Sequence, residues 1–382
     1  MQVLLLSPVA GVDVGGGDVT YTEALLAHPP AGVTYTTYTD ALEAGSLVER
    51  GRRLRHGRPR PADVAILGAR AAEAVLRRSG VLFREPYRFL TVDPDAFDLV
   101  HAHVFAMRQV GSDVPLVTSS GFPLPVLYRD RFGWPARRAA AVGGGERAVA
   151  ALLGAELPWR PPKRARRTMV QSDHFREVLV AAGGDPRRID VRPLGLDGAA
   201  GAPRRGPVRT VGFVATTFEE KGGAEAVAAV AALGDRWPDV RLEVVGSTPR
   251  DGIPDGLTGV TWRDRVSREE LLGPVLAGID ILVLPTRCDS GPPYVVLEAL
   301  QRGIPVVVSD LAWIDHGLTG PGVRRVPPRS GPVAEALAEL CDPATYVEAS
   351  RAALDLWRTR YAMDVVATAV GETYRAALGV PG

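Results

Sequence analysis

The chain has 382 residues, enough for two domains of ordinary size, and 46% of them are hydrophobic, so each domain has material for a buried core. A formal net charge of +1 gives no support to nucleic acid as the main partner. No apolar run approaches the roughly 18 residues of a membrane span. The start MQVLLLSPVAG has neither a basic leader nor a long apolar core, so we expect a cytoplasmic protein without a signal peptide.

Two residue types are scarce enough to guide the search for a site. The cysteines, Cys288 and Cys341, have neither CxxC spacing nor a disulfide framework, and we expect both to be small core or loop residues. Of 45 basic residues only two are lysines, Lys163 and Lys221. In a chain that otherwise uses arginine, each lysine is a candidate for a specific role.

In the first half of the chain, short apolar runs alternate with helical stretches, which is typical of βα units around a parallel sheet. Helices are expected to begin near Asp18, Ala136 and Asp173. Residues 194–207, LGLDGAAGAPRRGP, lack periodicity and are predicted to be an interdomain linker. The predicted strands are 3–7, 64–67, 99–102, 116–118, 168–171 and 190–193.

The second half repeats this alternation and predicts a second doubly wound domain. In such sheets ligands bind beyond the carboxyl ends of the strands, so we expect a shared ligand in a cleft between the domains. The tail, 343–378, is predicted to form two helices broken near 360–363. The other predicted helices are 221–233, 268–276 and 294–302, and the strands are 208–215, 241–245, 260–262, 279–284 and 306–309.

A lysine precedes two glycines where the first strand of the second domain leads into a helix, in FVATTFEEKGGAEAVAAV. Free N–H groups at a helix start, beside the Lys221 ammonium, form an anion site. Gly222 and Gly223 would let the backbone approach a ligand closely. The alternative is a charged helix start with a flexible cap.

The stretch ILVLPTRCDSGPPYVVLEALQRGIP has the same strand–loop–helix order and carries Glu298 among apolar residues. Because a charged glutamate is costly to bury alone, it needs a partner. Its two oxygens suit the hydroxyls of a ribose, while helix N–H groups face phosphate. Pairing with an arginine inside the core is the alternative.

Polar residues also follow two predicted strands of the first domain. Residues 12–19, VDVGGGDV, lack the third glycine of GxGxxG and form either a tight turn or a phosphate-facing loop, with Asp18 as helix N-cap. DLVHAH places His101 and His103 on one face of a strand end. Without a third ligand at a sensible spacing, the histidines favour a hydrogen-bonded wall of the cleft over a metal site.

Two arginine-rich clusters, RRLRHGRPR at 52–60 and WRPPKRARR at 159–167, fall in the first half. They are either solvated faces or contacts for an anionic acceptor or a membrane surface. We expect at most a weak peripheral membrane contact through them. The DxD at residues 93–95 is typical of a turn when it occurs alone.

Taken in order, the motifs resemble those of a known family. A glycine-rich loop follows the first strand, and then come DLVHAH, a Ser-Asp pair before a helix, PLGLD, EKGG and VVLEALQRGIPVVVSD. This succession is similar to that of GT-B glycosyltransferases of family GT4 and covers nearly the whole chain. The resemblance implies an α/β GT-B fold, in which two doubly wound Rossmann-like domains face a central cleft and a C-terminal helix crosses back to the N-terminal domain. The domains would be 1–200, completed by 362–382, and 206–361.

The resemblance implies transfer of a sugar from a UDP- or GDP-sugar to a hydroxyl acceptor, with retention at the anomeric carbon and without a metal or cofactor. Lys221 and His101 would be catalytic, with Lys221 on the diphosphate and Glu298 on the ribose. His103 and Ser120 would lie on the acceptor side. The other donor-binding positions would be Gly15, Gly16, Gly17, Thr216, Thr217, Asp289, Ser290, Gly291, Tyr294 and Val295.

The chain departs from the family pattern around the donor sugar and phosphate. Ser290 replaces the first glutamate of the E-x7-E motif, and Asp289 is our candidate substitute. Gly291 is followed by two prolines, which remove N–H groups from the loop. Thr216 stands where an arginine is common, and Ser120 where a histidine is common.

We therefore predict a metal-independent, retaining glycosyltransferase whose acceptor is a small molecule, a natural product or a glycoconjugate. Two alternatives stay open. A nucleotide-sugar epimerase would isomerise the donor without an acceptor. A non-catalytic homologue, which Ser290 and Thr216 favour, would bind nucleotide sugar without transferring it.

Overall fold

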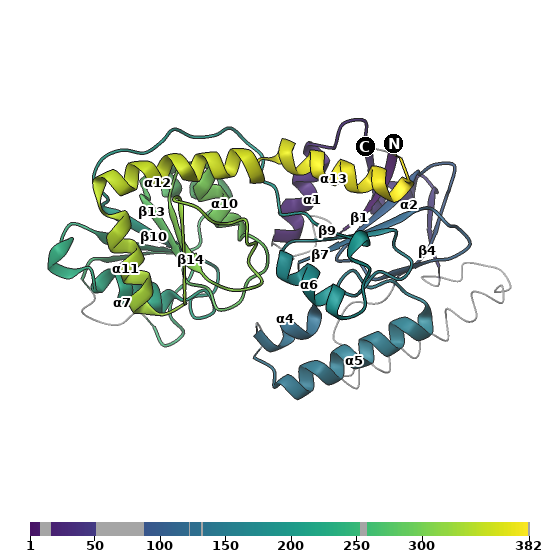
Figure 1. The fold of residues 1–382 in the computed structure, drawn as a ribbon, viewed down its shortest axis with the longest axis horizontal. Coiled ribbons are helices and arrows are strands. Elements are labelled where there is room, and N and C mark those ends of the chain that lie inside the picture. The colour runs from purple at the N-terminus through teal and green to yellow at the C-terminus, as the bar shows by residue number, and fades with distance from the viewer. Residues whose placement is uncertain (8–16, 51–87, 122, 131–132, 253–257, 381–382) are drawn as a thin grey trace. The chain divides into compact units, whose positions relative to one another are not determined.

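The computed structural model describes residues 1–7, 17–50, 88–121, 123–130, 133–252 and 258–380 (Figure 1). The predicted strand at 64–67 lies outside these ranges, as do Gly15, Gly16 and the arginine-rich segment 52–60. The chain divides into two compact units, the first formed by Met1–Arg192 with Ala367–Gly382 and the second by Pro193–Val366.

The first unit is built on a parallel sheet, which has six strands among the described residues, in the order β2-β1-β5-β7-β8-β9. The strand order reverses at β1, which has β2 on one side and β5 on the other. The strands are β1 (Gln2–Leu6), β2 (Thr34–Thr37), β5 (Leu99–His103), β7 (Leu116–Ser120), β8 (Arg167–Val170) and β9 (Ile189–Val191).

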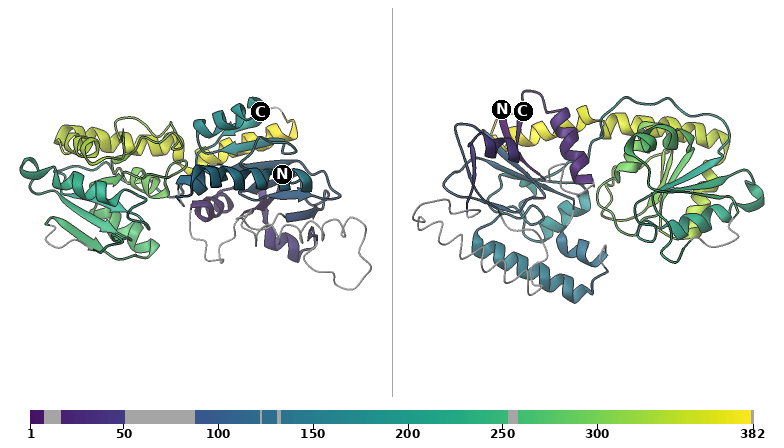
Figure 2. Two further views of the ribbon diagram at one scale, coloured as in Figure 1. Left: turned by 90° about the horizontal axis from the view of Figure 1, so that it is seen from below. Right: turned by 180° about the vertical axis from the view of Figure 1, so that it is seen from behind.

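Helices pack on this sheet, and the unit also contains a small second sheet with the strand order β3-β4-β6 (Figure 2). The small sheet consists of β3 (Leu47–Glu49), β4 (Arg88–Val92) and β6 (Met107–Gln109). The helices of the unit are α1 (Gly17–Ala27), α2 (Tyr38–Glu43), α4 (Leu124–Asp130), α5 (Ala136–Leu153), α6 (Asp173–Ala181), the short η1 (Pro186–Arg188) and most of α13 (Met363–Leu378). No helix in the described part of the chain is both long and apolar enough to cross a membrane.

The second unit has its own six-stranded parallel sheet, in the order β12-β11-β10-β13-β14-β15. Here the strand order reverses between β10 and β13, which pair directly. This is the strand order of a dinucleotide-binding doubly wound fold. The strands are β10 (Thr210–Val214), β11 (Arg241–Val245), β12 (Val260–Arg263), β13 (Ile281–Leu284), β14 (Val306–Ser309) and β15 (Val323–Val326).

The helices of the second unit follow its strands in the βα alternation expected from the sequence. Most are short, and two segments, η3 and η4, are π-helical. They are α7 (Gly223–Ala231), η2 (Gly234–Arg236), α8 (Arg268–Glu270), η3 (Leu271–Val275), α9 (Leu276–Gly278), α10 (Tyr294–Gln301), α11 (Ser330–Leu340), α12 (Pro343–Leu356) and η4 (Trp357–Tyr361).

The central strands are buried on both faces. Every residue of β5, β7, β13 and β14 is buried, including the polar ones. Continuous runs such as ILVL and VVVS are what a parallel strand covered by helices requires. The polar residues that interrupt such runs, above all His101 and His103, must therefore be hydrogen-bonded inside the unit.

Most predicted elements in the described ranges are confirmed to within two residues. The predicted helix at 268–276 is wrong in detail, because Gly273 leaves the helical region (φ −92°, ψ −107°) just before Pro274. The predicted helix at 221–233 begins only at Gly223, since Gly222 has a φ of +79°. Asp18 lies in the first turn of α1 and not before it.

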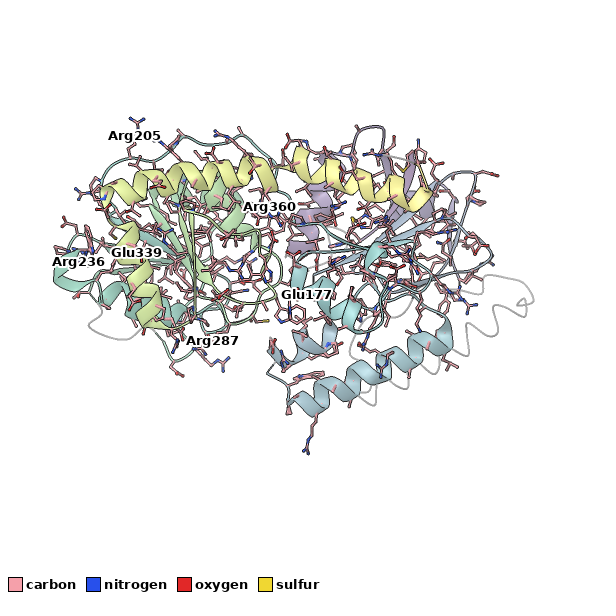
Figure 3. All side chains as sticks on the ribbon, viewed as in Figure 1. Glu177, Arg205, Arg236, Arg287, Glu339 and Arg360 are labelled. Atoms are coloured by element: carbon pink, nitrogen blue, oxygen red, sulfur yellow. The ribbon has the colours of Figure 1, made fainter. Side chains whose placement is uncertain are left out.

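The break predicted in the C-terminal tail is confirmed and has a clear anchor. Ala362 leaves the helical region (φ −62°, ψ 140°) after η4. The buried Asp315 carboxylate accepts two hydrogen bonds from the Arg360 guanidinium, at 2.9 and 2.8 Å, and one from the Tyr361 hydroxyl, at 2.7 Å. Arg360 is labelled in Figure 3. Beyond the break, the Thr373 hydroxyl lies 3.1 Å from a carboxylate oxygen of Asp190, inside the first unit.

Candidate functional site

Each sheet offers one place where ligands of doubly wound proteins bind, at the carboxyl ends of the strands beside the reversal of strand order. In the second unit, β10 and β13 lead into the loops 215–222 and 285–293. In the first unit, β1 and β5 end at Leu6 and His103. The candidate site residues of the two units gather at these two places.

Two glycines shape the loop between β10 and α7. A Cβ added to Gly222 would lie 2.1 Å from the carbonyl oxygen of Pro285, and one on Gly223 would lie 2.2 Å from the Phe218 ring. The glycines therefore let the start of α7 lie against the chain's own Pro285 and Phe218. The sequence predicted close approach to a ligand there. The structure gives the glycines a packing role that also holds Lys221 at the end of the loop.

Buried hydroxyl groups anchor the loop between β13 and α10. Thr286 Oγ1 donates to the carbonyl oxygen of Cys288 at 3.0 Å, and Ser309 Oγ donates to that of Thr286 at 2.6 Å. Gly291, with a φ of +60°, donates its N–H to the Trp313 carbonyl at 3.0 Å. Because the loop is fixed at both ends, the side chain of Asp289 has a defined position between them.

The two loops are joined by an ion pair. Lys221 Nζ donates to Oδ2 of Asp289 at 2.8 Å and to the carbonyl oxygen of Cys288 at 3.2 Å. A carboxylate oxygen of Glu220 lies 3.9 Å from the same nitrogen. The side chains of Lys221 and Asp289 are 20% and 18% exposed, so the pair is shielded yet reachable. A fixed ammonium group therefore lies beside the reversal of strand order.

The other predicted donor-binding residues of this unit lie on the same two loops and at the start of α10. The threonines of the first loop are exposed, and α10 begins without a side-chain cap at Pro293. Their roles toward a ligand stay predictions. These residues are Thr216, Thr217, Ser290, Gly291, Tyr294 and Val295.

Glu298, one turn into α10, is 2% exposed. Its Oε1 accepts a hydrogen bond from Arg268 Nη1 at 2.9 Å, and the Arg268 side chain is 54% exposed. Burial raises the pKa of the Glu298 carboxyl, while the positive charges of Arg268 and Arg302 oppose that rise. The arginine pairing considered from the sequence is thus present, and the ribose role stays a prediction.

In the first unit, the two predicted histidines share one hydroxyl. The Nε2 atom of His101 and the Nδ1 atom of His103 each lie 2.7 Å from Ser119 Oγ. Ser119 is the register partner of His103 on the neighbouring strand, which explains the contact. Ser120, the predicted acceptor-side residue, is buried one position further and faces the other side of the sheet.

The chain of contacts continues in both directions. His101 Nδ1 lies 2.8 Å from the Tyr374 hydroxyl, which lies 2.9 Å from the Tyr35 hydroxyl. His103 Nε2 lies 3.1 Å from Oδ1 of Asp18, whose side chain is 51% exposed. The buried histidines thus connect the interior of the unit with a carboxylate at its surface.

One arrangement of protons satisfies every group in this series of hydrogen bonds. Burial, together with His103, holds the pKa of His101 well below its ordinary value, so its ring is neutral. When Nε2–H of His103 donates to Asp18, its Nδ1 accepts from the Ser119 hydroxyl. Ser119 then accepts from Nε2–H of His101, whose Nδ1 accepts from Tyr374. The surface carboxylate therefore sets the direction of all the bonds.

These contacts change what can be expected of the histidines. His101 is fully buried and both of its ring nitrogens are engaged, which favours a positioning role over direct contact with a substrate. His103 is the ring nearer to the carboxyl end of β5. Gly17 begins α1 and is exposed.

The described residues contain no group of three or more histidine, cysteine, aspartate or glutamate side chains that could hold a metal ion. The Asp-Pro-Asp segment is a turn, in which the N–H of Asp95 donates to Oδ1 of Asp93 at 3.0 Å. This confirms its interpretation as a turn. Both cysteines are buried and neither forms a disulfide, as expected.

Sequence reasoning missed the partners of the candidate residues. Ser119 and Tyr374 were not singled out, although a buried polar strand end beside a histidine strand is a usable signal. Arg268 lies 30 positions before Glu298, and Tyr374 lies 273 positions after His101. Contacts across such separations follow from the fold and not from a local motif.

Comparison with known proteins agrees with this geometry. Residues 208–342, within the second unit, match the family described as Glycosyl transferases group 1. The D-inositol 3-phosphate glycosyltransferase of Mycobacterium tuberculosis is 30% identical over 268 residues, covering 60% of this chain and 51% of that protein. The chain therefore spans about half the length of the curated relatives it matches.

Solved structures resemble nearly the whole chain. A sucrose-phosphate synthase from Thermosynechococcus elongatus has a TM-score of 0.61 at 17% identity and covers 99% of both chains. HepE of Anabaena, solved in complex with UDP-glucose, has a TM-score of 0.57 at 14% identity and covers 98% of this chain and 99% of that one. At these identities the likeness establishes the fold. Residues 208–342 thus match group 1 glycosyltransferases and nearly the whole chain has the GT-B fold, which agrees with the resemblance of its motifs to family GT4.

Proposed function

We propose that this chain is a retaining glycosyltransferase that moves a sugar from a nucleotide diphosphate sugar to a hydroxyl acceptor without a metal ion. The observation that carries the proposal is the Lys221 ammonium, held 2.8 Å from Asp289 beside the reversal of strand order. A nucleoside diphosphate gains negative charge as it leaves, and a fixed cation stabilises that charge. The match of residues 208–342 to group 1 glycosyltransferases supports the same chemistry.

In the proposed reaction, the acceptor oxygen attacks the anomeric carbon on the face from which the nucleoside diphosphate leaves. The bond between the anomeric carbon and the phosphate oxygen breaks, and that oxygen takes the proton of the acceptor. Lys221 neutralises the diphosphate as its charge develops. Asp289 holds the ammonium in position beforehand and then shares it with phosphate oxygens, which compensates for the missing glutamate at Ser290.

Glu298 is proposed to accept the two hydroxyls of the donor ribose. Among the described side chains its carboxylate has Arg268 as hydrogen-bond donor, and that guanidinium is half in solvent. Burial already disfavours the ionised form, so two hydrogen bonds from a diol would stabilise the charge where it is most costly. The site would therefore read the sugar of the nucleoside and leave the base to other contacts.

The relatives indicate which substrates to try first. HepE was solved with UDP-glucose, which favours UDP-sugars over GDP-sugars as the first donors. Two relatives are named for phosphorylated products or substrates, a D-inositol 3-phosphate glycosyltransferase and a sucrose-phosphate synthase. Phosphorylated polyols and sugars are therefore the first hydroxyl acceptors to test. We place the reaction in the cytoplasm, where nucleotide sugars are made.

In the first unit, we propose that His103 lines the acceptor side and that His101 and Ser119 position it. The hydrogen bond from Ser119 fixes the tautomer of the His103 ring, and Asp18 fixes its orientation. Tyr374, which the C-terminal helix α13 contributes, completes the chain at His101. The tail of the protein thus supports the candidate site through hydrogen bonds as well as packing.

Replacement of Lys221 by alanine tests the proposed stabilisation of the leaving group. We expect turnover of a UDP-sugar or GDP-sugar to fall by roughly 10²- to 10³-fold, the usual cost of losing one such donor. Melting should stay cooperative. The control is Arg209→Ala, which removes an exposed cation from the same unit and should keep full turnover. Near-normal turnover of Lys221→Ala would overturn the assignment.

Glu298→Gln separates a ribose contact from a structural ion pair. The folded-state pKa of Glu298 is raised, so the wild type loses stability as pH rises from the unfolded-state pKa of about 4.3 toward the folded-state pKa. Relative to the wild type, the variant should therefore gain stability as pH rises above about 4.3. UDP or GDP affinity should fall about tenfold, because an amide offers one acceptor oxygen to the diol. A loss of stability at neutral pH with unchanged affinity would show a structural glutamate.

Ser119→Ala tests whether the hydrogen bonds of Ser119 to His101 and His103 position the two rings. Nitrogen NMR of labelled histidine side chains should show the Nε2–H tautomer for both rings in the wild type and mixed tautomers in the variant. Turnover should fall roughly ten- to hundredfold through misplacement of His103. Thr118→Val deletes a different buried hydroxyl, one that pairs with Thr168 at 2.9 Å, and should preserve both tautomers. Unchanged tautomers in Ser119→Ala would contradict the proposal that Ser119 fixes the tautomers of the two histidines.

A further inference from the structure

A cavity of about 770 Å³ opens in the first unit, away from the histidines. It lies where β6 meets the segments that lead into β7 and β8, so it is at the amino ends of those strands. Leu116, the first residue of β7, lines it, whereas Ser119 lies three residues further along that strand. At about 3.3 Å per residue, the cavity and the histidine chain are roughly 10 Å apart along β7.

The lining of this cavity is strongly basic. It includes five cationic residues, Arg108, Lys163, Arg164, Arg166 and Arg188. Its carboxylates are Asp113 and Glu156. Three of the five cations come from the cluster 159–167, which the proposed reaction does not use. One of them, Lys163, is the lysine of the chain other than Lys221.

The buried carboxylate in the lining accepts its hydrogen bonds from the backbone and not from the cationic side chains. The two oxygens of Glu156 accept hydrogen bonds from the backbone N–H groups of Lys163 and Arg164, at 3.0 and 2.8 Å. Glu156 therefore shapes the loop that presents these residues. Among the described residues, the side chains of Lys163, Arg164 and Arg166 have no hydrogen bond or ion pair. Arg167, next in sequence, instead pairs with Asp190 at 2.8 Å.

Two guanidinium groups are held close together at the wall of the cavity. Arg108 donates from Nη1 to the carbonyl oxygen of Leu153 at 2.9 Å, and its Nε is buried without a partner among the described residues. A Cβ on Gly154 would lie 3.3 Å from Nη2 of Arg164 and 3.6 Å from Cζ of Arg108. Gathering like charges around a shielded donor costs free energy unless an anion joins them.

We propose that this cavity binds a phosphate-bearing anion, held by Arg108, Lys163 and Arg164. Guanidinium groups match phosphate oxygens with paired hydrogen bonds, and a lysine adds a mobile point charge. Arg108 lines the cavity, and the hydrogen bond of its Nη1 to Leu153 holds its guanidinium in place. Because the cavity lies at the amino ends of the strands, its ligand is distinct from the proposed donor and acceptor. The phosphate belongs either to a soluble metabolite or to a lipid headgroup.

The test compares two double variants of the full chain. Lys163→Ala with Arg164→Ala removes two cations from the cavity but keeps the backbone N–H groups that Glu156 accepts, so the fold is retained. Arg205→Ala with Arg209→Ala removes two exposed cations elsewhere and serves as the charge-matched control (Figure 3). Binding of inorganic pyrophosphate is measured by calorimetry at low salt in both variants, in the wild type and in Lys221→Ala.

The wild type, Lys221→Ala and the control pair should retain a pyrophosphate site, and the cavity pair should bind it at least about tenfold more weakly. If Lys221→Ala lost pyrophosphate binding and the Lys163→Ala, Arg164→Ala variant kept it, the pyrophosphate would be bound at the donor site. That result would overturn the proposed cavity site and leave the proposed function intact. Co-sedimentation with phosphatidylglycerol vesicles, against phosphatidylcholine vesicles, identifies the source. Vesicle binding that needs the cavity cations points to a headgroup, and pyrophosphate binding without it points to a soluble ligand. Binding of neither probe, or equal binding by both double variants, would also overturn the inference.

Discussion

Lys221 and Asp289 lie 68 positions apart in the sequence, and their ion pair exists because β10 and β13 are neighbours in the sheet. A chain that runs outward from β10 to β12 and then returns to its other side leaves the loops after β10 and β13 facing each other. The packing of Gly222 against Pro285 joins those loops, and the hydroxyl of Thr286 stiffens the second. The proposed chemistry depends on this pair, because a flexible lysine would lose part of its electrostatic effect in becoming ordered.

In the first unit, a series of hydrogen bonds holds the candidate residues in place. Its sheet reverses at β1, and there the surface carboxylate of Asp18 meets the buried ring of His103. Burying two imidazoles is tolerable because Ser119 and Tyr374 satisfy their nitrogens. Desolvation keeps His101 neutral, and a neutral ring can donate on one side and accept on the other. Each hydrogen bond therefore has a defined donor and acceptor, from Tyr374 in the interior to Asp18 at the surface.

The sequence was most informative where the chain is most buried. Runs such as ILVL at 281–284 predicted parallel strands, because only a doubly covered strand is apolar on both faces. It was least informative about partners of buried polar groups: the glutamate in α10 was visible, but Arg268 was not. The strands β3 (LVE) and β6 (MRQ) are too short to show an alternation of apolar and polar residues, so they could not be predicted from the sequence. The π-helical segment before β13 departs from the helical periodicity of the sequence because Pro274 lacks an N–H and disfavours a helical Gly273 before it.

We propose that Lys221 anchors the diphosphate of a nucleotide-sugar donor, either released from Asp289 or shared with it. The most direct measurement is a crystal structure of the full chain with UDP or GDP bound. We expect a diphosphate oxygen within about 3 Å of Lys221 Nζ, and the ribose hydroxyls at the Glu298 carboxylate. A nucleotide bound elsewhere, with the Lys221–Asp289 pair unchanged and Glu298 still facing only Arg268, would contradict it.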